Sequence, residues 1–155
     1  MCLVVYNQKG FFMDRKKWLS LLAQSSSEDI ITLWDKAKIE CHFEVLRAAE
    51  IGAVMVQGRQ GGTGAPFNLG EMSVTRCSIK IAEGFIGHGY HQGRSKKTAE
   101  IIAKLDALLQ TVKFDAIVKT ILKPLEKRLQ AKEYNLAAKA EATKVNFFTL
   151  VRGED

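Results

Sequence analysis

The chain has few cysteines, and their spacing argues against two classes of small protein. It contains three, Cys2, Cys41 and Cys77, which lie dozens of residues apart without a Cys-x-x-Cys pair. An odd number of cysteines argues against a disulfide framework, and the missing ligand spacing argues against a zinc site. We therefore expect free thiols, which are typical of a reducing cytosol.

Long apolar segments are also missing. No run of apolar residues reaches the roughly 18 that are needed to cross a bilayer. The apolar start, residues 1–6, is followed at once by Asn7, Gln8 and Lys9, and it lacks the basic leader of a secretory signal. We expect a chain without a membrane span and with a cytoplasmic location.

Recognisable catalytic and metal-binding motifs are absent as well. The chain contains no nucleophile elbow, no His-Glu-x-x-His sequence and no paired-carboxylate motif. His42 stands alone, whereas His88 and His91 lie three apart in a predicted strand and should face opposite sides of it. We therefore expect no metal site and name no catalytic residue.

What the chain does contain is typical of one globular domain. Hydrophobic residues make up 46% and charged residues 26% of its 155 residues, so we expect an ordered single domain over 1–155. The net charge is +6. This charge fits an anionic partner, such as a nucleotide, a nucleic acid, a phosphate compound or an acidic protein surface. It fits a solvated basic surface equally well.

Helical patterns open the chain. Asp14 can cap a helix over 14–23, in which apolar residues fall at helical spacing. Ser25 and Glu28 have the spacing of a capping box, which predicts the start of a second, short helix. The apolar face of this second helix is formed by Ile30, Ile31, Leu33 and Trp34.

The middle of the chain favours strands. Strands are predicted over 42–49, 53–59, 71–81 and 85–92. Gly52 is expected at the turn between the first two, and residues 58–70 are expected to form a loop. In the third strand Cys77, Ile79 and Ile81 point one way and polar residues the other. Four strands in succession predict an antiparallel sheet.

Helical spacing returns in the last third of the chain. Apolar residues follow it over 101–112 and 114–122. Pro124 is expected to end this helix or to open the next one, which the composition predicts over 125–142. Asp106 falls on the apolar side, as a buried polar contact would. The fold class is therefore α+β, with a sheet of about four strands flanked by N-terminal and C-terminal helices.

A glycine-rich segment, residues 58–64, is the first candidate site. Arg59, Gly61, Gly62 and Thr63 lie in it, and its backbone amides could approach an anion. It is not a Walker loop, because no Gly-Lys-Ser/Thr follows. The alternative, a wide turn that needs positive φ angles, is favoured about two to one because glycine permits such angles generally.

The second candidate is the passage from the last strand to the following helix. Residues 89–98 include Gln92 and Arg94 and then Ser95, which can cap the helix. A helix N-terminus attracts anions through its free amides and its dipole. Simple capping by Ser95 explains the segment equally well, and both interpretations stay open.

Arginines accompany the predicted strands. Arg47, Arg59, Arg76 and Arg94 lie in or beside them, and arginine is the usual choice for bidentate phosphate or carboxylate contacts. If the strands pair, some of these side chains could converge on a phosphate. Salt bridges between subunits would use the same residues.

The C-terminal tail combines apolar residues with a charged end. Phe147, Phe148 and Leu150 would be costly to expose, since burying each contributes about 1.5–3 kcal/mol. They either return to the core of this domain or insert into a partner. Arg152 and the acidic residues after it could then make polar contacts at the rim of an interface.

Six segments, in this order and at these separations, resemble the PhnG family, the G subunit of the bacterial carbon–phosphorus lyase core complex. They are Phe43-Glu-Val-Leu-Arg-Ala-Ala-Glu50, Val54-Met-Val-Gln57, Gly61-Gly-Thr-Gly64, Val74-Thr-Arg-Cys77, Gln92-Gly-Arg94 and Asn146-Phe-Phe-Thr-Leu-Val-Arg-Gly153. No single segment is specific, whereas the ordered set is. It covers the chain from about residue 45 to its end. Residues 1–12 have no counterpart in the resemblance and are interpreted as an extension or as an upstream start.

The resemblance implies a role in phosphonate breakdown. Family members assemble with the H, I and J subunits, and with the H, I and L proteins they are linked to the displacement of adenine from MgATP by an alkylphosphonate. The product is a ribose 1-phosphonate 5-triphosphate. The resemblance implies that the G subunit supports the I subunit most directly, that MgATP is used by the complex and that this chain binds no cofactor of its own.

Two other functions remain as alternatives. The chain could be a stand-alone nucleotide-dependent transferase in which Arg94 and its neighbours grip phosphates. It could also be a basic nucleic-acid-binding module, although it lacks the interleaved surface aromatics and the recognisable motifs of such modules.

Overall fold

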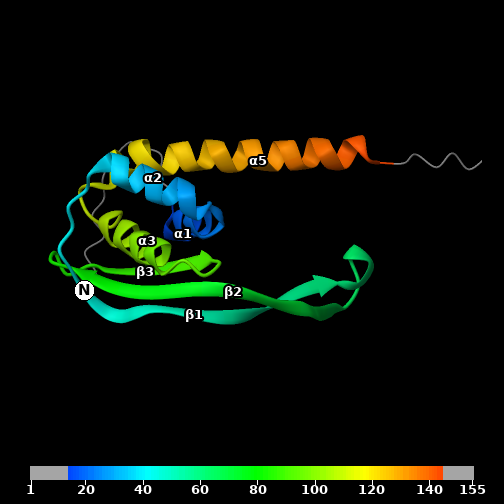
Figure 1. Ribbon diagram of the computed structural model, residues 1–155, viewed down its shortest axis with the longest axis horizontal. Helices are drawn as coiled ribbons and strands as arrows, with labels where there is room; N and C mark the ends of the chain where they lie inside the picture. Colours follow the sequence, from blue (N-terminus) through cyan, green and yellow to red (C-terminus); the bar gives the residue numbers. More distant parts are fainter. Residues whose placement is uncertain (1–13, 145–155) are drawn as a thin grey trace, which may run out of the picture.

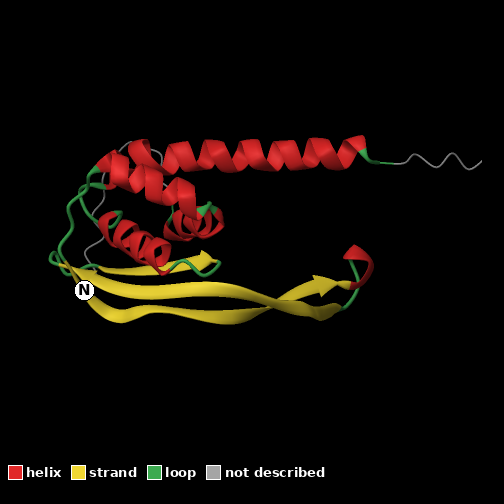
Figure 2. Ribbon diagram, viewed as in Figure 1, coloured by secondary structure: helices red, strands yellow, loops and turns green. Residues whose placement is uncertain are grey.

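The computed structural model describes residues 14–144, and this part of the chain is α+β (Figures 1 and 2). This architecture confirms the predicted fold class. Among the elements given next, η1 is a 3-10 turn and η2 is a π-helical turn. In chain order the elements are α1 Arg15–Gln24, α2 Ser27–Ala37, β1 Phe43–Arg59, η1 Gln60–Gly62, β2 Pro66–Ile81, β3 Ile86–Gln92, α3 Lys96–Leu108, α4 Phe114–Ile117, η2 Val118–Leu122 and α5 Lys123–Ala142.

The strands form one antiparallel sheet in the order β1-β2-β3, and the helices cover one of its faces. Figure 1 shows α1 and α3 next to the sheet, with α2 and α5 outside them. The core lies between these layers, where Leu22 of α1, Ile79 of β2 and Ile102 of α3 are fully buried. We call this part of the molecule the body.

The sheet has three strands rather than about four, because the first two predicted strands are one. β1 runs without a turn through Gly52, which pairs with Val74 of β2. The ladder keeps Gly52 extended, and its φ is not in the left-handed region. The loop predicted over 58–70 is also shorter, since β2 already begins at Pro66.

The alternation predicted for the next strand is confirmed. In β2, Cys77, Ile79 and Ile81 are buried in the core, whereas Arg76 and Lys80 are exposed on the opposite face. Apolar side chains that alternate with polar ones place one face of a strand against the core and the other in solvent. This pattern fixes the side of the sheet that the helices cover.

Two glycines bring β3 directly against α3. A Cβ added at Gly87 would lie 1.9 Å from the carbonyl oxygen of Ala103, and one added at Gly89 would lie 1.9 Å from that of Ala99. These distances are far inside van der Waals contact, so a side chain at either glycine would push the helix away. Ala99, Ala103 and Ala107 form the buried stripe of α3 that faces the glycines.

The N-cap of α2 lies one residue later than predicted. The Ser26 hydroxyl accepts a hydrogen bond from the Asp29 amide at 3.2 Å. The Ser25 hydroxyl instead donates to the Leu21 carbonyl at 2.7 Å and closes the end of α1. The predicted capping box of Ser25 and Glu28 is therefore wrong, because Ser25 is already used by the preceding helix.

The helices of the last third differ from the prediction at one boundary. The helix predicted over 101–112 ends at Leu108, where the Thr111 hydroxyl donates to the Leu108 carbonyl and Val112 is fully exposed. Pro124 opens α5, one of the two predicted outcomes. The backbone is helical on both sides of this proline, and the π-helical turn η2 directly precedes it.

A buried carboxylate joins α1, α3 and β3. Asp106 of α3 is fully buried, as predicted, and accepts hydrogen bonds from Arg15 Nε at 3.1 Å and Arg15 Nη2 at 2.7 Å. It also accepts from Trp18 Nε1 at 2.9 Å and from the His88 amide at 2.8 Å. Both carboxylate oxygens are thus satisfied, which is the condition under which a buried charge is tolerated.

We expect Asp106→Asn to lower the free energy of unfolding by about 1–3 kcal/mol, because it replaces a buried acceptor oxygen by an NH2 group that faces N–H donors. Urea unfolding followed by circular dichroism measures this loss. Asp35→Asn is the matched control, since Asp35 is exposed on α2. Equal stability of the two variants would show that the Asp106 network does not hold the layers together.

We expect Gly89→Ala to destabilise the protein by roughly 1–3 kcal/mol, because the added methyl group would collide with the backbone of α3. Gly70→Ala is the matched control, since a Cβ at Gly70 meets no atom within 4 Å. Thermal unfolding of both variants measures the difference. A Gly89→Ala protein as stable as the Gly70→Ala protein would contradict direct contact of β3 with α3.

Candidate functional site

The structure separates the predicted site residues into two groups. One group, Arg59 with residues 61–63, lies at the far end of the β1–β2 hairpin. The other lies beside the body, where Arg76 pairs with Glu50 of β1. Glu50 and Arg59 are nine residues apart on one strand, about 30 Å at the rise of a β-strand. The two groups therefore do not form one surface.

The glycine segment is a tight hairpin end. Gly61 and Gly62 have φ angles of 58° and 86°, in the region that favours glycine. The Gly64 amide donates to the Gln60 carbonyl at 2.8 Å, and Arg59 Nη1 donates to the Gly64 carbonyl at 3.3 Å. The interpretation as a turn is confirmed. The interpretation as an anion-binding loop stays a prediction.

Arg76 takes part in an ion pair within the chain. Its Nε donates to Glu50 Oε1 at 2.7 Å, and Arg47 donates to the same oxygen. The hydrogen bond from Arg76, together with the charges of both guanidinium groups, holds the pKa of Glu50 below its usual range. The three side chains are largely solvent-accessible, so this cluster adds little to stability. Two arginines on one carboxylate leave a net positive charge on the outer face of the sheet.

The second predicted group surrounds the start of α3. Ser95 caps the helix, as predicted, by accepting a hydrogen bond from the Thr98 amide at 3.3 Å. Gly93 has a φ of 115°, which turns the chain sharply out of β3. Gln92 and Arg94 on either side of it are exposed. Their side chains therefore lie at the surface of the body, next to the end of β3 and the positive end of a helix.

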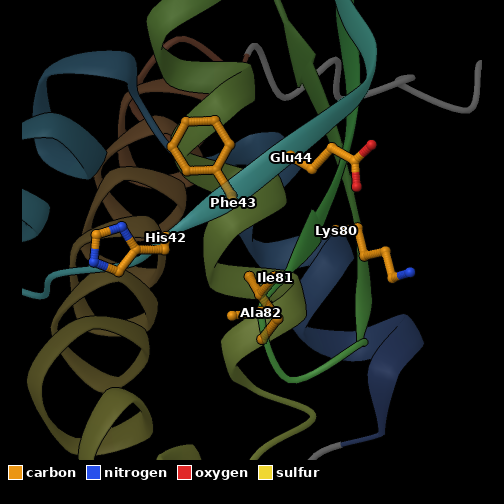
Figure 3. Close-up of a pocket in the computed structure, with 6 residues that line it drawn as sticks. All are labelled: His42, Phe43, Glu44, Lys80, Ile81 and Ala82. Carbon is orange, nitrogen blue, oxygen red and sulfur yellow. The ribbon is translucent and has the colours of Figure 1, made fainter.

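An open hollow of about 360 Å³ at the start of β1 holds titratable side chains that do not converge. Figure 3 shows Glu44 and Lys80 extending away from His42. The Nζ atom of Lys104 lies 4.0 Å from the centre of the Phe43 ring. An acid–base pair must lie within hydrogen-bonding reach of one reacting group, and these side chains do not. The residues that line the hollow are His42, Phe43, Glu44, Lys80, Ile81 and Ala82.

Thiol chemistry is disfavoured in the described part of the chain. Burial raises the pKa of Cys41 and of Cys77, so both favour the neutral thiol over the nucleophilic thiolate. Within residues 14–144, no group of three or more His, Cys, Asp or Glu side chains is placed to hold a metal ion. None of the helices in this range is both long and apolar enough to pass through a membrane.

Apolar side chains of the hairpin are the surface feature that the sequence interpretation missed. Ile51, Met55, Phe67 and Leu69 are all exposed. A signal was present, because residues 51–72 contain only two charged residues, Arg59 and Glu71. The predicted loop over 58–70 takes up about half of this segment. Side chains in a loop have no defined face, so the sequence does not indicate an exposed apolar face here.

The predicted contact tail lies outside the described residues. Phe147, Phe148, Leu150 and Arg152 belong to it, and the predicted extension over 1–12 also lies outside. The roles assigned to both segments remain predictions.

Comparison with known proteins supports the resemblance noted in the sequence. A family model described as phosphonate metabolism protein PhnG matches residues 13–153. The chain is also 38% identical over 141 residues to a protein of Rhizobium meliloti (strain 1021) named alpha-D-ribose 1-methylphosphonate 5-triphosphate synthase subunit PhnG. The alignment covers 91% of this chain and 90% of that protein. The chain therefore belongs to the PhnG family of phosphonate metabolism proteins.

Proposed function

We propose that this chain is the G subunit of a carbon–phosphorus lyase assembly. In this role it supports, without performing, the displacement of adenine from MgATP by an alkylphosphonate. The product of that reaction is a ribose 1-phosphonate 5-triphosphate. The observation that carries the proposal is the similarity, over 91% of the chain, to a protein that is named a subunit of this synthase.

The geometry of the described residues supports a role in assembly. The polar candidates are divided between the hairpin end and the start of α3, so they cannot act on one small substrate together. The hairpin exposes a series of large apolar side chains instead. Contiguous exposed apolar surface on a soluble domain typically marks a contact with another protein.

The partners that we propose are the other subunits of the same assembly. The I subunit is the most direct partner, and the H, J and L proteins complete the set. MgATP is the substrate of the whole complex, and this chain is proposed to bind no cofactor of its own. Gln92 and Arg94 are proposed as subunit or phosphate contacts, and Phe147 and Phe148 as anchors of the tail on a partner.

The two alternatives have less support. A stand-alone transferase needs its phosphate-binding side chains to converge, and the ladder of β1 and β2 keeps Arg59 far from Arg76 and Arg94. A nucleic-acid-binding module usually presents aromatic side chains among basic ones. Near the hairpin end, the exposed aromatic Phe67 pairs with Gly58, and Arg59 is the one basic residue between positions 51 and 72.

We expect the chain to co-elute with the I subunit after co-expression, because a G subunit assembles with its partners. Size-exclusion chromatography with mass determination measures this assembly. Adenine release from MgATP in the presence of methylphosphonate should require this chain together with the H, I and L proteins.

Mixtures that lack this chain, and the chain by itself, are the controls for that measurement. Both should release no adenine. A monomeric chain that does not bind the I subunit, and that by itself releases adenine from MgATP, would contradict the proposal and support the transferase alternative.

A further inference from the structure

The β1–β2 hairpin continues far beyond the body of the molecule. Figure 1 shows its far end projecting past the helices that cover the sheet. We call residues 51–72 the hairpin arm. None of them is buried, and the exposed fractions of Ile51, Met55, Phe67 and Leu69 are 47%, 53%, 48% and 65%. The arm is therefore an apolar extension that the other residues of the range 14–144 leave uncovered.

Both faces of the hairpin arm are apolar. The ladder is regular from Ile51 to Val56, so side chains alternate between the two faces. Ile51 pairs with buried Thr75 and shares the helix-side face with Met55. Val54 and Val56 lie on the opposite face. A flat partner surface could cover only one face, so a partner that covers both must enclose the arm.

The strand edges of the arm are also open. β3 ends at Gln92, which pairs with Val74, so among the described residues the arm from Ala53 to Met72 consists of two strands alone. An isolated two-stranded ribbon is only marginally stable in water. Natural edge strands are usually protected by lysine or proline, and β1 contains neither. An enclosing partner could therefore pair with this edge as well.

The end of the arm carries an apolar knob. A Cβ added at Gly58 would lie 2.1 Å from Leu69 Cδ1 and 3.6 Å from Phe67 Cε1. The side chains of Leu69 and Phe67 therefore lie across Gly58, and they fill the space that any larger residue would need. Two large side chains held in place on a narrow ribbon have the form of an anchor that fits an apolar pocket.

A second projection extends in the same direction as the hairpin arm (Figure 1). Every residue of α5 from 130 to 142 is exposed, and Figure 1 shows this helix extending in the same direction as the hairpin. We call residues 130–142 the helix arm. Lys132, Leu136 and Lys139 lie together along it, at the spacing of one helix face. This face is basic around an apolar centre.

We propose that the two arms together grip one partner subunit, with an apolar cleft that encloses the hairpin arm and with carboxylates that face Lys132 and Lys139. Charge decides the kind of occupant. Lys132 and Lys139 share one face of the helix with Arg128, and the two glutamates of the helix arm, Glu133 and Glu141, do not line this face, so two copies that met through it would repel each other. A different protein with an acidic rim is the complementary partner, and this inference rests on the proposed assembly function.

Leu69→Asp tests the proposal in the complex with the I subunit. The substitution places a charge on the apolar knob, and we expect the dissociation constant to rise about 30-fold or more. Val112→Asp is the matched control, because Val112 is an equally apolar residue that is 100% exposed outside both arms. It should bind like the wild type. Thermal unfolding of both variants should match the wild type, since neither side chain belongs to the core.

Lys132→Glu with Lys139→Glu tests the helix arm in the same assay. We expect weaker binding and a smaller loss of affinity with added salt than for the wild type, because two attractive charge contacts are removed.

Binding of Leu69→Asp that equals that of Val112→Asp would overturn the proposed grip while leaving the assembly function intact. A wild-type chain that binds no I subunit would instead refute the assembly function itself. A wild-type dimer that Leu69→Asp dissociates would show that a second copy occupies the arm, and it would overturn the proposal.

Discussion

The body of this protein depends on one buried carboxylate. Asp106 receives hydrogen bonds from Arg15 and Trp18 of α1 and from the His88 amide of β3. A charge inside a core is tolerated only where hydrogen bonds and a countercharge compensate it, so α1, α3 and β3 are constrained to the arrangement that brings these donors together. The close contact of β3 with α3 across Gly89 is the steric counterpart of the same constraint.

This constraint ends where β3 ends. From Val74 to Lys80, β2 pairs with β1 on one side and with β3 on the other, and helices cover this part of the sheet. Beyond Val74, which pairs with Gln92, the hairpin has neither a third strand nor a buried residue. One part of each of the strands β1 and β2 therefore belongs to the body, and the other part forms the hairpin arm. Residues 14–144 thus combine a packed core with a ribbon that they leave exposed, and an exposed apolar ribbon of this kind favours contact with another protein.

Local patterns predicted the elements of the fold better than their connections. The alternation of Cys77, Ile79 and Ile81 and the polar position of Asp106 were sufficient, because burial leaves a periodic trace in the sequence. The sequence favours a turn at Gly52 because glycine is common in turns. Only its cross-strand partner, Val74, shows that this glycine lies within a strand. Long-range pairing likewise decides that Arg59 and Arg76 do not converge. The ordered set of segments indicates the PhnG family. No local pattern shows that Leu69 lies on an arm that the described residues leave exposed.

The position of the second candidate group follows from this architecture. Gln92 is the last residue of β3, and Arg94 precedes the cap of α3, so both lie at the base of the hairpin arm. A partner that encloses the arm down to its base would meet these side chains and the positive end of the helix. Contact with a subunit and contact with a phosphate are then compatible roles for Arg94. Arg94 is exposed at the base of the arm, so in the proposed assembly the partner would determine which anion its guanidinium meets.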